Sequence, residues 1–196
     1  MISLGTVFWL MVFFFSLIGV LRGWTKEVVA TSGLVLSLFA INQFGYAIIN
    51  FLSDAPPSDI YADALRRQQF YWLGSLHIAI AFFSYQGPAI AGRNVVERLR
   101  VRDSFQDKLL GGIVGALNGY LIVGAMWSLL EYVRDINGWV RLPANLRYPF
   151  EGEFLLRPPD VLQLEGLIGT LPLPLLSAYL PFLVVIVFLF VLVVMI

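Results

Sequence analysis

The sequence predicts an all-α membrane protein, a polytopic helical bundle of about five transmembrane helices with an extramembrane loop between the fourth and the fifth. Apolar residues make up 59% of the 196 residues, charged residues only 13%, and the mean hydropathy is +0.80. A soluble domain carries about 25% charged residues. The 13 basic and 13 acidic side chains fall between the apolar runs. These runs lack the dyad alternation of an outer-membrane strand, so helices are expected.

Five stretches are long and apolar enough to span, because a helix needs about 20 such residues to cross roughly 30 Å of hydrocarbon. They cover residues 4–21, 28–52, 70–92, 109–130 and 175–196. We therefore divide the chain into a four-helix core (1–130), an extracytoplasmic loop (131–174) and a C-terminal transmembrane helix (175–196). The last stretch ends in unbroken apolar sequence with no basic flank, which leaves open whether the native chain continues beyond Ile196.

The basic residues predict the orientation. The first and third connections lie on the same side and carry seven basic residues: Arg22, Lys26, Arg93, Arg98, Arg100, Arg102 and Lys108. The second and fourth connections carry six, spread over a longer stretch of chain. The positive-inside rule then places the N-terminus outside and the C-terminus in the cytoplasm of a bacterial inner membrane.

The fourth connection is rich in proline and aromatic residues, and it contains Trp139, Tyr148, Phe150 and Phe154. Asp160, with Gln163 three residues later, predicts the cap of a short helix lying at the membrane surface. Two interpretations stay open for this connection: an ordered loop with an interfacial helix, or a docking surface for an extracytoplasmic partner.

The predicted fourth helix has a face of small residues. Gly111, Gly115 and Gly119 recur every four residues, and Gly112 and Ala116 lie beside them. Because residues four apart share a helix face, another backbone could approach closely there, as in small-xxx-small packing. The face could serve packing within this bundle or contact with another subunit. Just before it, Ser104 and Asp107 have the spacing of a capping box.

Two segments resemble the colicin V production protein (CvpA) family. The first connection, with Arg22, Gly23 and Glu27, is similar to the family's Arg-Gly pair followed by an acidic residue four positions later. Asp107 and Lys108, leading into the glycine-rich run, are similar to its second signature. The resemblance covers roughly residues 3 to 130 and implies a four-helix core, an inner-membrane address and a link to bacteriocin production or export. Asn118 stands where the family usually has a basic residue, and residues 131–196 form a divergent extension.

Two polar features fall at or inside predicted spans. Arg22 and Glu27 could pair across the first turn, and interfacial anchoring would explain them. His77 is the single histidine, and an ionisable residue inside a span is a functional hypothesis by default. It could contact a pigment or another ligand, but a hydrogen bond to a neighbouring helix is the simpler role.

Composition also limits the function. With no cysteine and one histidine, the chain has no thiolate or multi-histidine metal site, and no catalytic motif is found. Zero net charge gives no case for nucleic acid. We therefore expect no enzyme and no required cofactor, with pigment, quinone or lipid contact left open. The leading hypothesis is an accessory subunit that packs with other membrane subunits and lipid in a larger bacterial complex, with a photosynthetic or respiratory host favoured. The alternative is a small transporter or channel for bacteriocin export.

Overall fold

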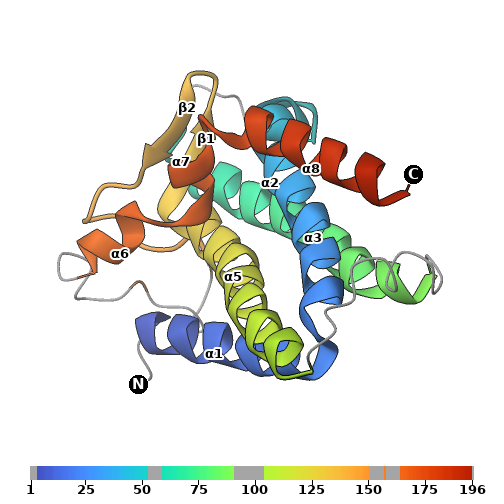
Figure 1. Ribbon diagram of the computed structural model, residues 1–196. Helices are drawn as coiled ribbons and strands as arrows, with labels where there is room; N and C mark the ends of the chain where they lie inside the picture. The colour runs from blue at the N-terminus through green and yellow to red at the C-terminus, as the bar shows by residue number, and fades with distance from the viewer. Residues whose placement is uncertain (1–3, 53–58, 91–103, 151–156, 158–163, 196) are drawn as a thin grey trace.

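The computed structural model describes residues 4–52, 59–90, 104–150, 157 and 164–195, and among these residues the chain is almost entirely helical (Figure 1). Four long helices form the bundle: α1 (Leu4–Arg22), α2 (Trp24–Leu52), α3 (Asp63–Ile90) and α5 (Ser104–Glu131). They correspond to the first four predicted spans. The predicted all-α membrane fold is confirmed.

The helices differ in how well they suit a membrane. Among the described residues, α1, α2 and the range Phe105–Glu131 of α5 are long and apolar enough to cross a bilayer. Helix α3 has 28 residues, which is sufficient length, but its sequence contains more polar side chains, including His77 and Gln86. These polar residues matter for what α3 contacts inside and outside the bundle.

The predicted fifth span is not one continuous helix. A short helix, α7 (Pro172–Leu176), is followed by a turn and then by α8 (Leu180–Met195), which has 16 residues. At 1.5 Å per residue, the described part of α8 is about 24 Å long. The break follows the sequence, because Pro172, Pro174 and Pro181 lack the backbone N–H groups of a continuous helix.

A β-hairpin at the end of α5 was not predicted. Strands β1 (Tyr132–Asp135) and β2 (Gly138–Arg141) pair antiparallel, with Asp135 opposite Gly138. Gly138 has a φ of 139°, which L side chains rarely adopt. The Asn137-Gly138 dipeptide, between strands that carry valines, was the signal in the sequence. The hairpin marks one end of the bundle, which we call the hairpin end; the α1–α2 connection marks the turn end.

The helices are arranged around α5. Helix α1 packs along α5, α2 packs against both α3 and α5, α7 lies on α5, and α8 lies on α2. Figure 1 shows α8 leaving the bundle toward the C-terminus. Helix α6 (Glu165–Gly169) lies in the predicted fourth connection. The proposed cap of an interfacial helix, Asp160 and Gln163, lies outside the described residues.

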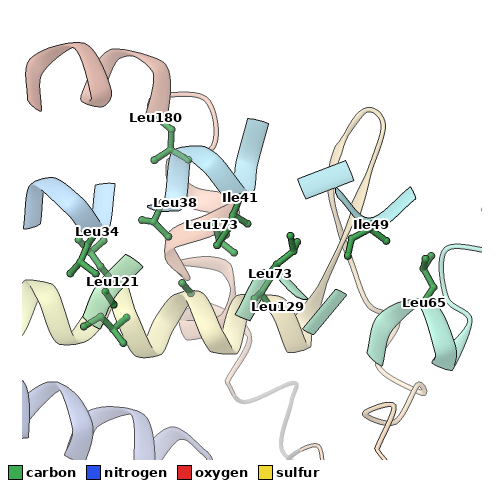
Figure 2. Close-up of a cluster of buried hydrophobic side chains, with 13 residues drawn as sticks. Leu34, Leu38, Ile41, Ile49, Leu65, Leu73, Leu121, Leu129, Leu173 and Leu180 are labelled. Carbon is green, nitrogen blue, oxygen red and sulfur yellow. The ribbon is translucent and has the colours of Figure 1, made fainter. Parts of the chain in front are cut away.

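Two apolar clusters form the interior. The larger one joins α2, α3 and α5, and its leucines meet between the helices (Figure 2). Leu34, Leu38 and Leu73 in this cluster are fully buried. The second cluster lies near the hairpin end, where Phe8 of α1 and Trp127 of α5 meet Ile168 and Leu171. Residues 164–173, which lie within the predicted extramembrane loop, therefore pack onto the bundle.

Candidate functional site

The turn end of the bundle is built on Gly23. Helix α1 ends at Arg22, and the N–H of Gly23 donates to the carbonyl of Gly19 at 2.9 Å. Gly23 has a φ of 81°, in the left-handed region that favours glycine after a helix. Helix α2 begins at the next residue, Trp24. One residue thus reverses the chain, which explains the Arg-Gly pair noted in the sequence.

Asp107 of α5 fixes this turn. Its Oδ1 accepts a hydrogen bond from the backbone N–H of Trp24 at 3.1 Å, so it caps α2 from a different helix. A Cβ on Gly23 would lie 2.5 Å from Oδ2 of the same carboxylate. The sequence analysis assigned Asp107 to a capping box with Ser104 on its own helix. Helix α5 starts at Ser104, whose side chain lies outside the described part, and the partner that the structure gives Asp107 is α2.

Arg22 and Glu27 form an ion pair across this turn, with Nη1 and Oε1 2.9 Å apart. The Glu27 side chain is fully buried, and the Arg22 side chain is 21% exposed. Arg22 Nη2 also donates to the carbonyl of Tyr85 on α3 at 2.8 Å, and its guanidinium lies 4.3 Å from the centre of the Tyr85 ring. The pairing considered from the sequence is present, and it also reaches a third helix.

Asn118 completes the arrangement from α5. Its Nδ2 donates to Glu27 Oε2 at 2.8 Å and to the Glu27 carbonyl at 3.1 Å. The Tyr85 hydroxyl donates to the same Oε2 at 3.1 Å. The Thr31 hydroxyl donates a hydrogen bond to Asn118 Oδ1 at 2.7 Å. We call Arg22, Glu27, Thr31, Tyr85 and Asn118 the Glu27 cluster.

The Glu27 cluster joins four helices through one buried carboxylate. A carboxylate away from water is tolerated only when it is paired and hydrogen-bonded, and these partners satisfy that need. The neutral Asn118 donates to the carboxylate, and Arg22 supplies the positive charge beside it. The sequence does not indicate that Tyr85 and Thr31 belong to the Glu27 cluster, because only the packing of α2 and α3 brings them to Glu27.

The glycine face of α5 packs against α1 inside the chain. A Cβ on Gly115 would lie 2.5 Å from the carbonyl of Phe15, and one on Gly119 would lie 2.7 Å from the Phe15 Cβ. Gly111 and Gly19 approach through their backbones. These glycines therefore do not form a free face for another subunit, and that interpretation is corrected.

The two remaining small residues of this face also lie inside the chain. Gly112 faces Val20, and its carbonyl accepts a hydrogen bond from Ser16 at 2.9 Å. Ala116 is partly buried against the cluster that contains Phe8. Contacts of α1 thus extend over the whole small-residue face.

His77 is fully buried between helices. Its Nδ1 lies 2.8 Å from the hydroxyl of Ser37 on α2, so the predicted hydrogen bond to a neighbouring helix is confirmed. Its Nε2 has no hydrogen-bond partner among the described residues, and contact with a pigment or another ligand stays a prediction. Among the described residues, no group of three or more His, Cys, Asp or Glu could hold a metal ion.

The aromatic residues of the fourth connection face the bundle. Trp139 donates from its indole N–H to Asn42 Oδ1 at 2.9 Å, and Tyr148 is buried. The Phe150 ring lies 5.2 Å from the ring of Phe70. These three residues therefore have contacts inside the chain, but Trp139 and Phe150 are only half-buried, and the docking surface stays a prediction. Phe154 lies outside the described residues.

A second buried charge lies at the hairpin end. Glu131, fully buried, pairs with Arg157 at 2.6 Å and accepts a hydrogen bond from the Tyr148 hydroxyl at 2.5 Å. Arg157 also donates to the carbonyls of Leu142 and Leu146. Burial, with the nearby Glu131 charge, raises the pKa of Tyr148 above its usual range. No local sequence pattern indicates this pair, since 25 residues separate its members.

Two arrangements thus mark this chain: an Arg-Gly turn whose acidic residue lies in the Glu27 cluster, and an aspartate that leads into a glycine face packed on α1. The comparisons with curated proteins and with solved structures gave no match. A family model described as colicin V production protein matches residues 4–142, which includes the four long helices and the hairpin. The chain belongs to the colicin V production protein family.

Proposed function

We propose that this chain is a non-catalytic accessory or assembly subunit that packs against another integral membrane protein in a larger bacterial membrane complex. Its proposed contact is α8. The proposed location is the inner membrane, with the N-terminus outside and the C-terminus in the cytoplasm. The observation that carries the proposal is α8, an apolar helix that the bundle leaves largely uncovered, beside a bundle whose buried carboxylates are paired inside the chain.

Helix α8 has an apolar surface on several sides. Phe182, Ile186 and Phe188 are 70%, 60% and 63% exposed. Its contacts with the rest of the chain are mainly with α2, through residues such as Leu180 and Leu183. A helix that is apolar all round is normally buried in a large core or in a membrane.

Helix α8 lies outside the family match, which ends at residue 142. The proposal therefore places the contact on a part of the chain that the family model does not include.

The polar groups of the bundle give less support to transport. A pathway would need polar side chains facing a cavity, whereas Glu27, Asn118 and His77 are buried and bonded to neighbouring helices. The family's link with colicin V production keeps transport as the second candidate. Substrate flux through liposomes containing the purified chain alone would favour transport over the accessory role.

Gentle purification of the tagged chain from native membranes, followed by mass spectrometry, tests the proposal. We expect a stoichiometric membrane protein to co-purify with the native chain. A double variant on α8, Ile186→Ala with Phe188→Ala, should lose it. The matched control is Phe13→Ala with Leu17→Ala on α1, where the residues are 63% and 47% exposed. Retention of the same protein by the α8 variant, or purification of the native chain alone, would refute the proposal.

A further inference from the structure

An apolar groove runs along the outer surface of α3. It has a volume of about 530 Å³, and Met126 of α5 closes one side. Three small residues, Gly74, Ser75 and Ala79, line the middle of the groove together with Ile78. A Cβ on Gly74 would lie 3.1 Å from the Met126 methyl group, so the glycine lets this side chain lie close to α3. We call this feature the α3 groove.

Aromatic residues close both ends of the α3 groove. Phe70 and Tyr71 lie toward the hairpin end, and Phe82 and Phe83 lie toward the turn end. Phe150 contacts the first pair edge-to-face, with its ring 5.2 Å from Phe70 and 6.0 Å from Tyr71. The groove is therefore a bounded depression, unlike the continuous small-residue stripe that a packed helix would need.

The length and depth of the groove fit one leaflet of a bilayer. From Tyr71 to Phe82, α3 rises by roughly 17 Å at 1.5 Å per residue. One leaflet contributes about half of the roughly 30 Å hydrocarbon thickness. Tyr71 and its aromatic neighbours lie where an interfacial aromatic belt is expected, and the small residues lie deeper. This placement matches an acyl chain that enters from the interface.

A cationic residue precedes the aromatic end of the groove by about one helical turn. Arg67 precedes Tyr71 by four residues, so the two side chains share a face of α3. A guanidinium at the level of the lipid headgroups suits a phosphate, because arginine binds phosphate oxygens with paired hydrogen bonds. The apolar lining suits the acyl chain of a lipid, and the arginine suits the phosphate of the same lipid.

We propose that the α3 groove binds a phospholipid of the bilayer, with one acyl chain between the aromatic ends and its phosphate at Arg67. This inference is independent of the proposed partner of α8, because the groove and α8 lie on different helices. A transmembrane helix of another protein is the competing occupant, and the experiment below separates the two.

Native mass spectrometry tests whether the groove binds the acyl chain. The detergent-purified chain is titrated with palmitoyl-oleoyl phosphatidylglycerol. Ala79→Phe fills the floor of the groove, and Ala47→Phe makes the same change at an exposed position of α2. We expect Ala79→Phe to weaken lipid binding about tenfold, equivalent to 1.4 kcal/mol, and Ala47→Phe to leave it unchanged. Ser75→Leu, from the neighbouring position, should repeat the loss if Ala79→Phe folds poorly.

Binding of the phosphate at Arg67 is tested with palmitoyl-oleoyl glycerol, which has the same two acyl chains and no phosphate. The native chain should prefer the phospholipid, and Arg67→Gln should remove that preference while binding of the diacylglycerol stays the same. Equal lipid retention by Ala79→Phe and Ala47→Phe would overturn the proposal and favour a helix as the occupant. An unchanged preference in Arg67→Gln would overturn the assignment of the phosphate to Arg67.

Discussion

Glu27 shows how much one buried side chain can contribute in this molecule. It accepts hydrogen bonds from Asn118 and Tyr85 and pairs with Arg22 at 2.9 Å. Removing one partner of a buried pair leaves the other groups without compensation, which costs more than the pair itself contributes. Four helices would lose a common partner at once.

Glu27→Ala should lower the free energy of unfolding by about 3–5 kcal/mol, because it leaves Arg22, Asn118 and Tyr85 without their acceptor. Thermal unfolding of the purified chain in detergent measures the effect. The control is Glu165→Ala, since Glu165 is 62% exposed in its pair with Arg141 and an exposed pair contributes only about 0–1 kcal/mol. Similar losses in the two variants would contradict the role given to Glu27.

Tyr148 makes the stability of the fold depend on pH in the alkaline range. Burial raises its pKa above the ordinary value of 10.0, and the Glu131 charge adds to the shift. Stability from this hydroxyl is therefore complete below pH 10, where the unfolded tyrosine is still protonated. It is lost as the pH rises further, because the unfolded state releases its proton first.

The stability of the native chain should thus fall relative to Tyr148→Phe as the pH rises from 8 to about 11. Melting temperatures of both chains across this range provide the measurement, and their difference removes the effects of other tyrosines, such as Tyr132. A constant difference between the two chains at all pH values would show that Tyr148 does not titrate in this way.

At the scale of elements, the contact between α1 and α5 depends on the absence of side chains. Hydrocarbon surrounding the bundle gives no hydrophobic gain for helix association, so close backbone packing has to supply the attraction. Gly111, Gly115 and Gly119 meet Phe15 and Gly19 in this contact. Side chains added to α5 there would push the helices apart.

Gly115→Leu should destabilise the bundle by about 1–3 kcal/mol or more, because its Cβ alone would lie 2.5 Å from the Phe15 carbonyl. Gly166→Leu on α6 is the matched control, since a Cβ there meets nothing within 4 Å. Melting temperatures in detergent should fall for the first variant and change little for the second. A small effect of Gly115→Leu would mean that α1 and α5 do not need this approach.

Long apolar runs made the four main helices predictable, because their hydropathy depends on local sequence alone. The turn at Gly23 and the ion pair of Arg22 with Glu27 were also within reach, since only a few residues separate them. The contact of Asp107 with α2 could not be predicted, and neither could the ion pair of Glu131 with Arg157. Each joins segments whose approach depends on tertiary packing. The hairpin had a local signal in Asn137-Gly138, which the prolines of the following segment obscured.

At the scale of the whole molecule, the turn end and the hairpin end should face opposite sides of the membrane. Lys26 lies in the first turn of α2, and Ile136 lies in the hairpin, where it is 65% exposed. The natural sequence contains no cysteine, so single cysteines can be introduced without background. The positive-inside rule assigns the turn end to the cytoplasm.

Ile136→Cys should therefore react with a membrane-impermeant maleimide added to intact spheroplasts, whereas Lys26→Cys should react only after the membrane is opened. Mass shift on a gel measures the labelling. The reverse pattern would invert the orientation, and labelling of both cysteines in intact spheroplasts would contradict a bundle that crosses the membrane.

The whole molecule combines a helical bundle with an exposed apolar helix, and the proposed function requires that helix to meet another protein. Site-specific photo-crosslinking in native membranes tests this most directly, with a photoreactive phenylalanine at Ile186 on α8 or at Leu17 on α1, both exposed. The account predicts one discrete protein adduct from position 186 and none from position 17. Lipid adducts alone from both positions would contradict it.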